Sequence, residues 1–171
     1  MFDAIVEAAA AESPLWGGAV LPADEQVRDP VFSRLAPDGH ALGLETIYEG
    51  YLVHYGRSRM FASADRDTAL LLGDYLYAHG LVHVAETGDV AAVADLAELI
   101  SLCAQGRAEG RAGDGAAWAA TSALLGGGGL DLARAALRET GDPSMLDAVA
   151  RVTAGDSAVD AALAAHARLV G

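Results

Sequence analysis

The chain has 171 residues, and its 24 acidic residues outnumber 11 basic ones, which gives a formal net charge of −13 at pH 7. So acidic a chain offers no basic face for phosphates, and we exclude nucleic acid as a partner. Hydrophobic residues form 53% of the chain, but no stretch approaches the roughly 20 apolar residues of a membrane-spanning helix. The N-terminus is acidic where a signal peptide is basic, so we expect a cytoplasmic protein with no transmembrane segment.

The sequence predicts an all-α fold in a single domain spanning 1–171, because alanine is abundant and the period-2 alternation of strands is rare. The single cysteine, Cys103, has no partner for a disulfide, and its apolar neighbours predict a small buried side chain. We divide the chain into an N-terminal helix (2–11) with an irregular, proline-interrupted arm (together 1–40), core helices (41–109) and shorter C-terminal helices (110–171).

The first core helix is predicted over 41–56, and one stripe of it should be buried. Glu45 and Glu49 fall outside this stripe. The members of the stripe follow the spacing i, i+4, i+7, i+11 and are Leu44, Tyr48, Tyr51 and Tyr55.

The second core helix, over 66–86, is apolar almost all round between Leu70 and Val84. This pattern is typical of a helix surrounded by other helices or covered by a partner subunit. A third helix follows over 90–105, for which we predict an inward stripe of Val90, Val93, Ala97, Ile100 and Ala104, and an outward set of Asp95, Glu98 and Gln105. After a glycine-rich loop at 106–115, shorter helices are expected at 116–125, 130–140, 143–153 and 156–169.

One pair of histidines has the spacing of metal ligands. His79 and His83 stand one turn apart on the predicted 66–86 helix, and Glu86 lies a turn further along the same face, which could ligate zinc. The zincin pattern requires glutamate beside the first histidine, whereas Gly80 stands there. This face is therefore a weak metal candidate beside the simpler interpretation of a polar surface or subunit contact. We expect no cofactor on this chain.

Asp74 is the most informative single residue, because it lies inside the apolar run of the 66–86 helix. A buried carboxylate must be paired or hydrogen-bonded. We expect a structural salt bridge to Arg57 or Arg59, and the functional alternative is a position that lines a ligand cavity.

Several stretches of the core resemble the trans-isoprenyl diphosphate synthases. In that family a helix reading L-x-G-D-Y-L-x-A follows the first aspartate-rich motif, and the next helix ends near an x-E-G-E stretch. The resemblance covers about residues 41–127 and implies a truncated isoprenoid-synthase-like helical bundle. The stretches that carry it are YLVH (51–54), DTALLLGDYLYAH (67–79), ETGD (86–89), AQGRAE (104–109) and, more weakly, 115–127.

The chain departs from this family at both aspartate-rich motifs. Where the first DDxxD would stand it reads YGRSRM over 55–60, and the second motif has no counterpart. In the family those carboxylates hold the Mg²⁺ that assists ionisation of the allylic diphosphate. The chain therefore resembles the small non-catalytic subunit of heterodimeric heptaprenyl and hexaprenyl diphosphate synthases. That implies a DDxxD-bearing large subunit as partner, Mg²⁺ on the partner alone, and a role in activity or product length.

The resemblance also suggests roles for individual side chains. Arg57 and Arg59 are candidates to contact a diphosphate. Tyr51, Tyr75 and Tyr77 are candidates to contact the growing chain or the partner, and ordinary core packing is the alternative role for each of them. A second function that the sequence allows is a homodimeric helical protein that binds an isoprenoid or other apolar ligand, and a third is a metal enzyme using His79, His83 and Glu86. The candidates to contact the partner or the growing chain are Tyr51, His54, Asp74, Tyr75, Leu76, Tyr77 and Val84.

Overall fold

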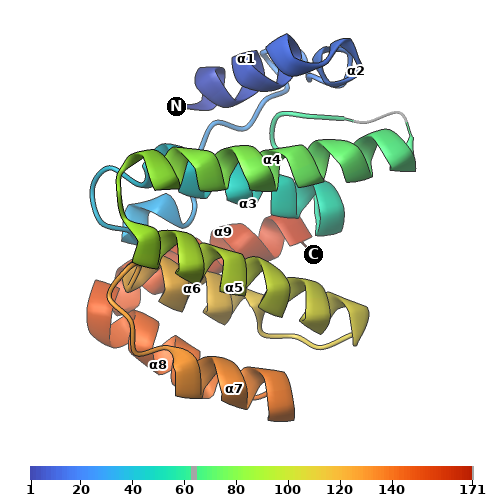
Figure 1. Ribbon diagram of the computed structural model, residues 1–171. Coiled ribbons are helices and arrows are strands. Elements are labelled where there is room, and N and C mark those ends of the chain that lie inside the picture. The colour runs from blue at the N-terminus through green and yellow to red at the C-terminus, as the bar shows by residue number, and fades with distance from the viewer. Residues whose placement is uncertain (63–64, 171) are drawn as a thin grey trace.

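The computed structural model describes residues 1–62 and 65–170, and over these ranges its regular structure is helical (Figure 1). The all-α prediction is therefore confirmed. No helix in this part of the chain is both long and apolar enough to cross a membrane. The helices are α1 (Phe2–Glu12), α2 (Pro14–Gly17), η1 (Ser33–Leu35, a 3-10 turn), α3 (Ala41–Tyr55), α4 (Arg66–Glu86), α5 (Val90–Ala108), α6 (Asp114–Ala123), α7 (Asp131–Thr140), α8 (Ser144–Ala154) and α9 (Asp156–Val170).

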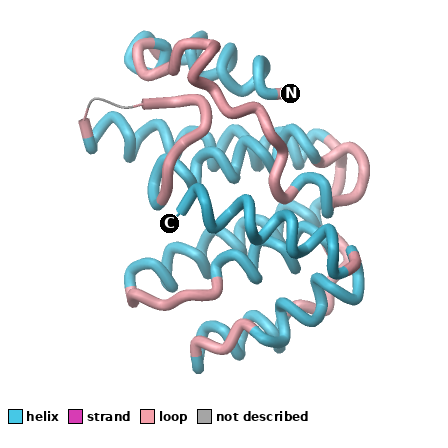
Figure 2. Tube along the Cα trace, turned by 180° about the vertical axis from the view of Figure 1, so that it is seen from behind, coloured by secondary structure: helices cyan, strands magenta, loops and turns pink. Residues whose placement is uncertain are grey.

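The helices lie in layers. In Figure 1, α4 and α5 form the front layer, with α3, α6 and α9 behind them, while α1 with α2 and α7 with α8 lie at opposite ends. Figure 2 shows the back of the molecule, where the irregular arm between α2 and α3 runs beside α9. Backbone hydrogen bonds hold this arm, because the N–H of Leu21 donates to the carbonyl of Met60 (2.9 Å) and that of Val27 to the carbonyl of Arg59 (3.0 Å).

Helices α3 and α4 pack so closely that their backbones touch at glycines. A Cβ atom added at Gly80 would lie 2.7 Å from the carbonyl oxygen of Gly43, and one added at Gly50 would lie 2.9 Å from the carbonyl oxygen of Gly73. Each helix thus carries two glycines seven residues apart. Gly43 meets Gly80 and Gly50 meets Gly73, so the two helices are antiparallel. The glycine of the GDYL stretch is therefore explained by close helix packing.

The aromatic stripe predicted on α3 is confirmed, with Tyr48 and Tyr51 fully buried and Tyr55 half-buried at its end. Trp118 of α6 stacks on Phe32 of the arm at a centroid distance of 5.6 Å, and it meets the ring of Tyr48 edge-to-face at 5.0 Å. Side chains from three distant segments therefore fill the centre of the molecule.

The stripe predicted to face inward on α5 is confirmed only in part, because Val93 and Ile100 are half-buried against the main core but Val90 and Ala97 are not. Val90 is 79% exposed and Ala97 is exposed, whereas Leu96, Leu99 and Leu102 are buried. The polar residue predicted to face water, Asp95, is buried as well, because Arg134 of α7 pairs with it at 2.9 Å. Periodicity could not settle which face is buried because α5 is apolar on both sides.

Helix α4 is not surrounded by the other described helices of this chain, and the alternative, that a partner subunit covers it, stays a prediction. Leu72, Leu76 and Val84 are buried on one side of the helix, whereas Leu71 is 58% exposed and Val82 is 54% exposed on the other. Among the described residues, α3 covers the side that carries the close-packing glycines, and α2 meets α4 at Tyr75, whose ring lies 4.4 Å from that of Trp16.

Candidate functional site

A buried ion-pair network joins α3 to the segment that follows it. The Nε of Arg59 donates to Glu49 Oε2 at 2.9 Å, its Nη1 donates to Glu45 Oε2 at 2.7 Å, and none of the three side chains is exposed. These glutamates lie outside the aromatic stripe of α3 and are nevertheless buried. Their burial is possible because a carboxylate in the interior is tolerated where it is paired and hydrogen-bonded.

The same carboxylates hold backbone groups of the adjacent loops. Oε1 of Glu45 accepts the N–H groups of Val31 (3.0 Å) and Ser33 (3.1 Å) in the arm. Oε1 of Glu49 accepts the N–H of Arg59 (2.8 Å) and of the residue after it (3.1 Å). One face of α3 therefore fixes both the arm and the segment between α3 and α4, and the interior placement of Arg59 is primarily structural.

The partner predicted for Asp74 is wrong. Its side chain is 65% exposed, and it pairs with His54 of α3, whose Nε2 lies 3.2 Å from Asp74 Oδ1. Burial lowers the pKa of His54 below its ordinary value, although the charge of Asp74 acts in the opposite direction. Neither Arg57 nor Arg59 reaches this carboxylate: Arg57 is exposed and has no carboxylate partner in the described part of the chain.

A second polar cluster lies where the C-terminal ends of α3 and α5 meet the start of α6. The hydroxyl of Tyr51 donates to Asp114, and Arg107 donates both to this hydroxyl (2.6 Å) and to the same carboxylate. His166 of α9 completes the cluster, because its Nδ1 lies 2.9 Å from the hydroxyl of Tyr48 and its Nε2 lies 3.7 Å from Asp114. No local pattern in the sequence indicated this cluster, because its members come from four helices.

The ionisation states of Asp114 and Tyr51 in this cluster do not change near neutral pH. Burial raises the pKa of Asp114, but contacts with His166 and Tyr51 and the charge of Arg107 outweigh it, so the pKa lies well below the ordinary value. The pKa of Tyr51 is raised, first by burial and then by Asp114. At neutral pH the site therefore holds an ionised carboxylate and a neutral phenol, neither of which is poised for proton transfer.

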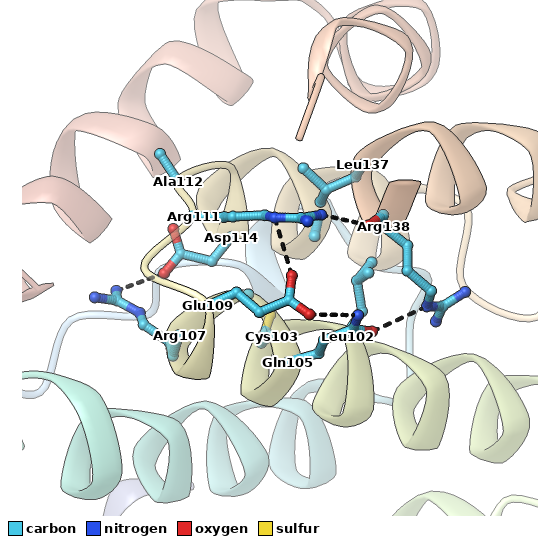
Figure 3. A pocket seen from close by; sticks show the side chains of 12 residues that line it. Leu102, Cys103, Gln105, Arg107, Glu109, Arg111, Ala112, Asp114, Leu137 and Arg138 are labelled. Atoms are coloured by element: carbon cyan, nitrogen blue, oxygen red, sulfur yellow. Dashed lines mark hydrogen bonds and ion pairs between the residues drawn. The ribbon is translucent and has the colours of Figure 1, made fainter. Parts of the chain in front are cut away.

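Figure 3 shows the pocket beside this cluster. Its volume is about 20 Å³, which is room for one water molecule. Arg107 and Asp114 also line a more open depression of about 470 Å³. The arginines of the smaller pocket are engaged with carboxylates, as Arg111 with Glu109 (2.9 Å) and Arg138 with Glu98. Burial raises the pKa of Cys103 at its base, so this thiol is not an activated nucleophile.

The histidine face of α4 is assembled as the spacing predicts. The two Nε2 atoms of His79 and His83 lie 3.1 Å apart, and Nδ1 of His83 lies 3.3 Å from Glu86. Burial, and then the neighbouring His83, lowers the pKa of His79. Among residues 1–62 and 65–170, no group of three or more histidine, cysteine, aspartate or glutamate side chains could hold a metal ion.

Helices α4 and α5 lie at the front of Figure 1, and the exposed apolar side chains of Leu71 and Val82 on α4 and Val90 on α5 give them an apolar outer surface. Asp74 is the charged residue among those that we assign to this surface. Half-buried Leu81, Val93 and Ile100 pack toward the main core along the seam between the helices. We call this surface the α4/α5 outer face, and its residues are Leu71, Asp74, Ala78, Leu81, Val82, Ala85, Val90, Val93, Ala97, Ile100 and Ala104.

The residues predicted to contact the partner or the growing chain separate into those buried in this chain and those that are only half-buried. Tyr51, Leu76 and Val84 are buried within this chain, and they do not reach the surface. Tyr75 packs at a centroid distance of 4.4 Å on Trp16 of α2, and half-buried Tyr77 lies 5.2 Å from the ring of His54.

Comparisons with protein-family models, with curated proteins and with solved structures found no match to this chain.

Proposed function

We propose that this chain is the non-catalytic small subunit of a long-chain polyprenyl diphosphate synthase, which works in the cytoplasm and assembles with a DDxxD-bearing large subunit through the α4/α5 outer face. The observation that carries the proposal is the exposure of this face. Leu71, Val82 and Val90 are each more than half exposed, and an apolar surface that extends over two helices is typical of a protein interface.

The composition of the face suits another pair of helices. The face contains alanines at positions 78, 85, 97 and 104, of which the first three are exposed, beside the larger Leu71, Val82 and Val90. Ridges of a partner helix can pack into such a surface. Asp74 and its partner His54 add one polar contact, which can fix the register of the partner.

The interior supports a role without catalysis. The glutamates of α3 are engaged by Arg59, and Asp114 is engaged by Arg107 and Tyr51. These carboxylates hold the fold together and leave the departure of a diphosphate group to the large subunit. The aromatic core of Tyr48, Tyr51 and Trp118 fills the space between α3 and α6, so the interior supports an apolar-ligand role less well than assembly.

A turnover assay tests the proposal. Farnesyl diphosphate, isopentenyl diphosphate and Mg²⁺ are incubated with this chain alone, with the DDxxD-bearing synthase of the same organism alone, and with both. We expect long-chain product to be formed in the mixture and not by either protein alone. No gain on mixing would overturn the proposal and leave a self-associating protein as the interpretation of the outer face.

A matched pair of variants connects the assay to the face. Leu71→Arg places a charge on the outer face and should abolish the gain on mixing. Leu132→Arg places the same charge at a 77% exposed leucine on α7, away from the face, and should preserve it. Equal loss in both variants would show that the effect is not specific to this surface.

A further inference from the structure

Two imidazole rings of α4 face each other across one turn of the helix. The Nε2 atoms of His79 and His83 lie 3.1 Å apart, and the two rings meet at 74° with their centroids 4.4 Å apart. Both side chains are half-buried, and neither belongs to the α4/α5 outer face. The spacing in the sequence makes this pair a weak metal candidate, and the structure adds that the two nitrogens converge.

The separation of the two nitrogens suits a shared metal ion. Two imidazole nitrogens bound to one tetrahedral Zn²⁺, each at about 2.0–2.1 Å from the metal, lie about 3.3 Å from one another. The 3.1 Å between the Nε2 atoms of His79 and His83 is close to this value. One ion could therefore bind both side chains after only a small adjustment of their rings.

Glu86 prepares His83 to act as a ligand. Its Oε2 lies 3.3 Å from Nδ1 of His83, the ring nitrogen that does not face His79. An Nδ1–H that donates to this carboxylate leaves the lone pair of Nε2 free, and carboxylates in this position orient the imidazoles of metal sites. The structure therefore makes Glu86 a positioning residue beside the histidine pair, where the sequence had suggested a third ligand.

The ring of His79 is held in place by aromatic stacking. It stacks on Tyr75 with a centroid distance of 5.2 Å and an interplanar angle of 15°. Tyr75 in turn packs on Trp16 of α2 at a centroid distance of 4.4 Å. Contacts within the chain thus orient both histidines before any ion arrives.

The charges around the pair favour a cation. Burial, and then the neighbouring His83, lowers the pKa of His79, so this imidazole is neutral at pH 7. Neutral imidazole is the form that binds a metal. The negative charges of Glu86 and of Glu12, the last residue of α1, also act on this ring. Two carboxylates therefore lie near enough to stabilise a positive ion there.

We propose that His79 and His83 bind a divalent transition-metal ion such as Zn²⁺ through their Nε2 atoms. Imidazole nitrogen suits Zn²⁺, Cu²⁺ and Ni²⁺, whereas Mg²⁺ and Ca²⁺ prefer oxygen ligands. Over the described ranges no group of three or more histidine, cysteine, aspartate or glutamate side chains could hold a metal ion. The chain therefore supplies two ligands, and water fills the other positions. The proposal does not depend on the proposed function, because it requires neither the outer face nor a large subunit.

An NMR titration of the full chain tests the site. Zn²⁺ is added at neutral pH in the presence of excess Mg²⁺, which occupies the oxygen-only sites that so acidic a chain offers. We expect the imidazole resonances of His79 and His83 to shift together. The resonances of His40, His54 and His166 should stay in place and serve as internal controls. Unmoved resonances of the α4 pair, or equal shifts of all five histidines, would overturn the proposal.

Calorimetric titration of variants with Zn²⁺ separates the ligands from the positioning residue. His83→Gln leaves one imidazole and should abolish binding. Glu86→Gln keeps both ligands and should weaken binding by about tenfold or more, since carboxylates behind metal-binding histidines contribute about 10–100-fold to affinity. The matched control, Glu139→Gln, removes the same charge from an exposed position on α7 and should stay within about twofold, because distant surface charges are screened.

Circular dichroism checks that the variants are folded, which we expect because the changed side chains are exposed or half-buried. Zn²⁺ binding that His83→Gln leaves unchanged would overturn the proposal. Equal weakening by Glu86→Gln and Glu139→Gln would show a general charge effect and overturn the role given to Glu86. These outcomes would leave the gain of turnover on mixing unaffected.

Discussion

The two faces of α4 are both apolar, but the chain covers only one of them. The inner face meets α3 through paired glycines and buries Leu72, Leu76 and Val84, whereas the outer face leaves Leu71 and Val82 more than half exposed. The inner face is specified by backbone contact, which tolerates no added atom. The outer face presents side chains that another protein can cover. A helix apolar all round can therefore serve one fold and one partner at the same time.

The packing of α4 on α3 also depends on the ion pairs of Arg59 with Glu45 and Glu49 behind α3. Breaking these pairs should have the largest effect on stability. Arg59→Met leaves Glu45 and Glu49 buried without their cation, and the free energy of unfolding should fall by about 3–5 kcal/mol. Urea denaturation followed by circular dichroism measures this loss. The control, Arg66→Met, should change stability by less than about 0.5 kcal/mol. A loss below about 1 kcal/mol for Arg59→Met would show that the network contributes little.

The glycine contact itself is tested by adding one methyl group. In Gly80→Ala the new Cβ would lie 2.7 Å from the carbonyl oxygen of Gly43, so α3 and α4 must separate, and we expect a loss of about 2–3 kcal/mol. The matched control is Gly106→Ala on α5, where the nearest atom is 3.9 Å away. That change should stabilise the chain by about 0.5–1 kcal/mol through helix propensity. If both variants gain stability, the helices are not in backbone contact.

On the outer face the folding effect should be small. Leu71→Arg should change the free energy of unfolding of the isolated chain by no more than about 0.5 kcal/mol, because its side chain is 58% exposed. Leu76→Arg, one turn away and fully buried, should prevent folding. Thermal unfolding of the two variants measures the contrast. Equal destabilisation would mean that both faces of α4 belong to the core of this chain.

The smallest expected effect is a shift in the pKa of His54 on α3, which pairs with Asp74 on the outer face of α4. Burial lowers the pKa of His54 and Asp74 acts against it, so Asp74→Asn should lower this pKa further. Because the folded pKa lies below the ordinary value of 6.5, the unfolded chain binds the proton more readily, and stability falls as the pH drops below about 6.5. An NMR titration of the imidazole measures the shift. An unchanged or raised pKa in Asp74→Asn would contradict the pairing.

The sequence predicted the helices well because their limits are set locally. Asp89 before Val90 is a start signal that a reader can recognise. Ser13 with Pro14 is another, but it begins the short α2, which lies in the arm predicted to be irregular. Which side of a helix faces inward was less predictable. Both sides of α5 are apolar, so periodicity could not choose between the stripe that contains Val90 and the one that contains Leu96.

The polar sites were missed for a different reason. Glu45 and Glu49 are buried because Arg59 approaches from another segment, and Asp114 depends on Arg107 and Tyr51. Such partnerships join residues that are far apart along the chain, and no local pattern reports them. The seven-residue glycine spacing on α3 and α4 was visible in the sequence, and it could have identified the covered face of α4.

Sedimentation of the mixture tests the central claim, that the α4/α5 outer face binds a large subunit, most directly. Analytical ultracentrifugation is run on this chain mixed with the DDxxD-bearing synthase of the same organism, first as wild type and then as Leu71→Arg. We predict a stable complex of the two proteins with the wild-type chain and separate species with the variant. A mixture that never forms a complex, or a complex that survives Leu71→Arg unchanged, would contradict the account.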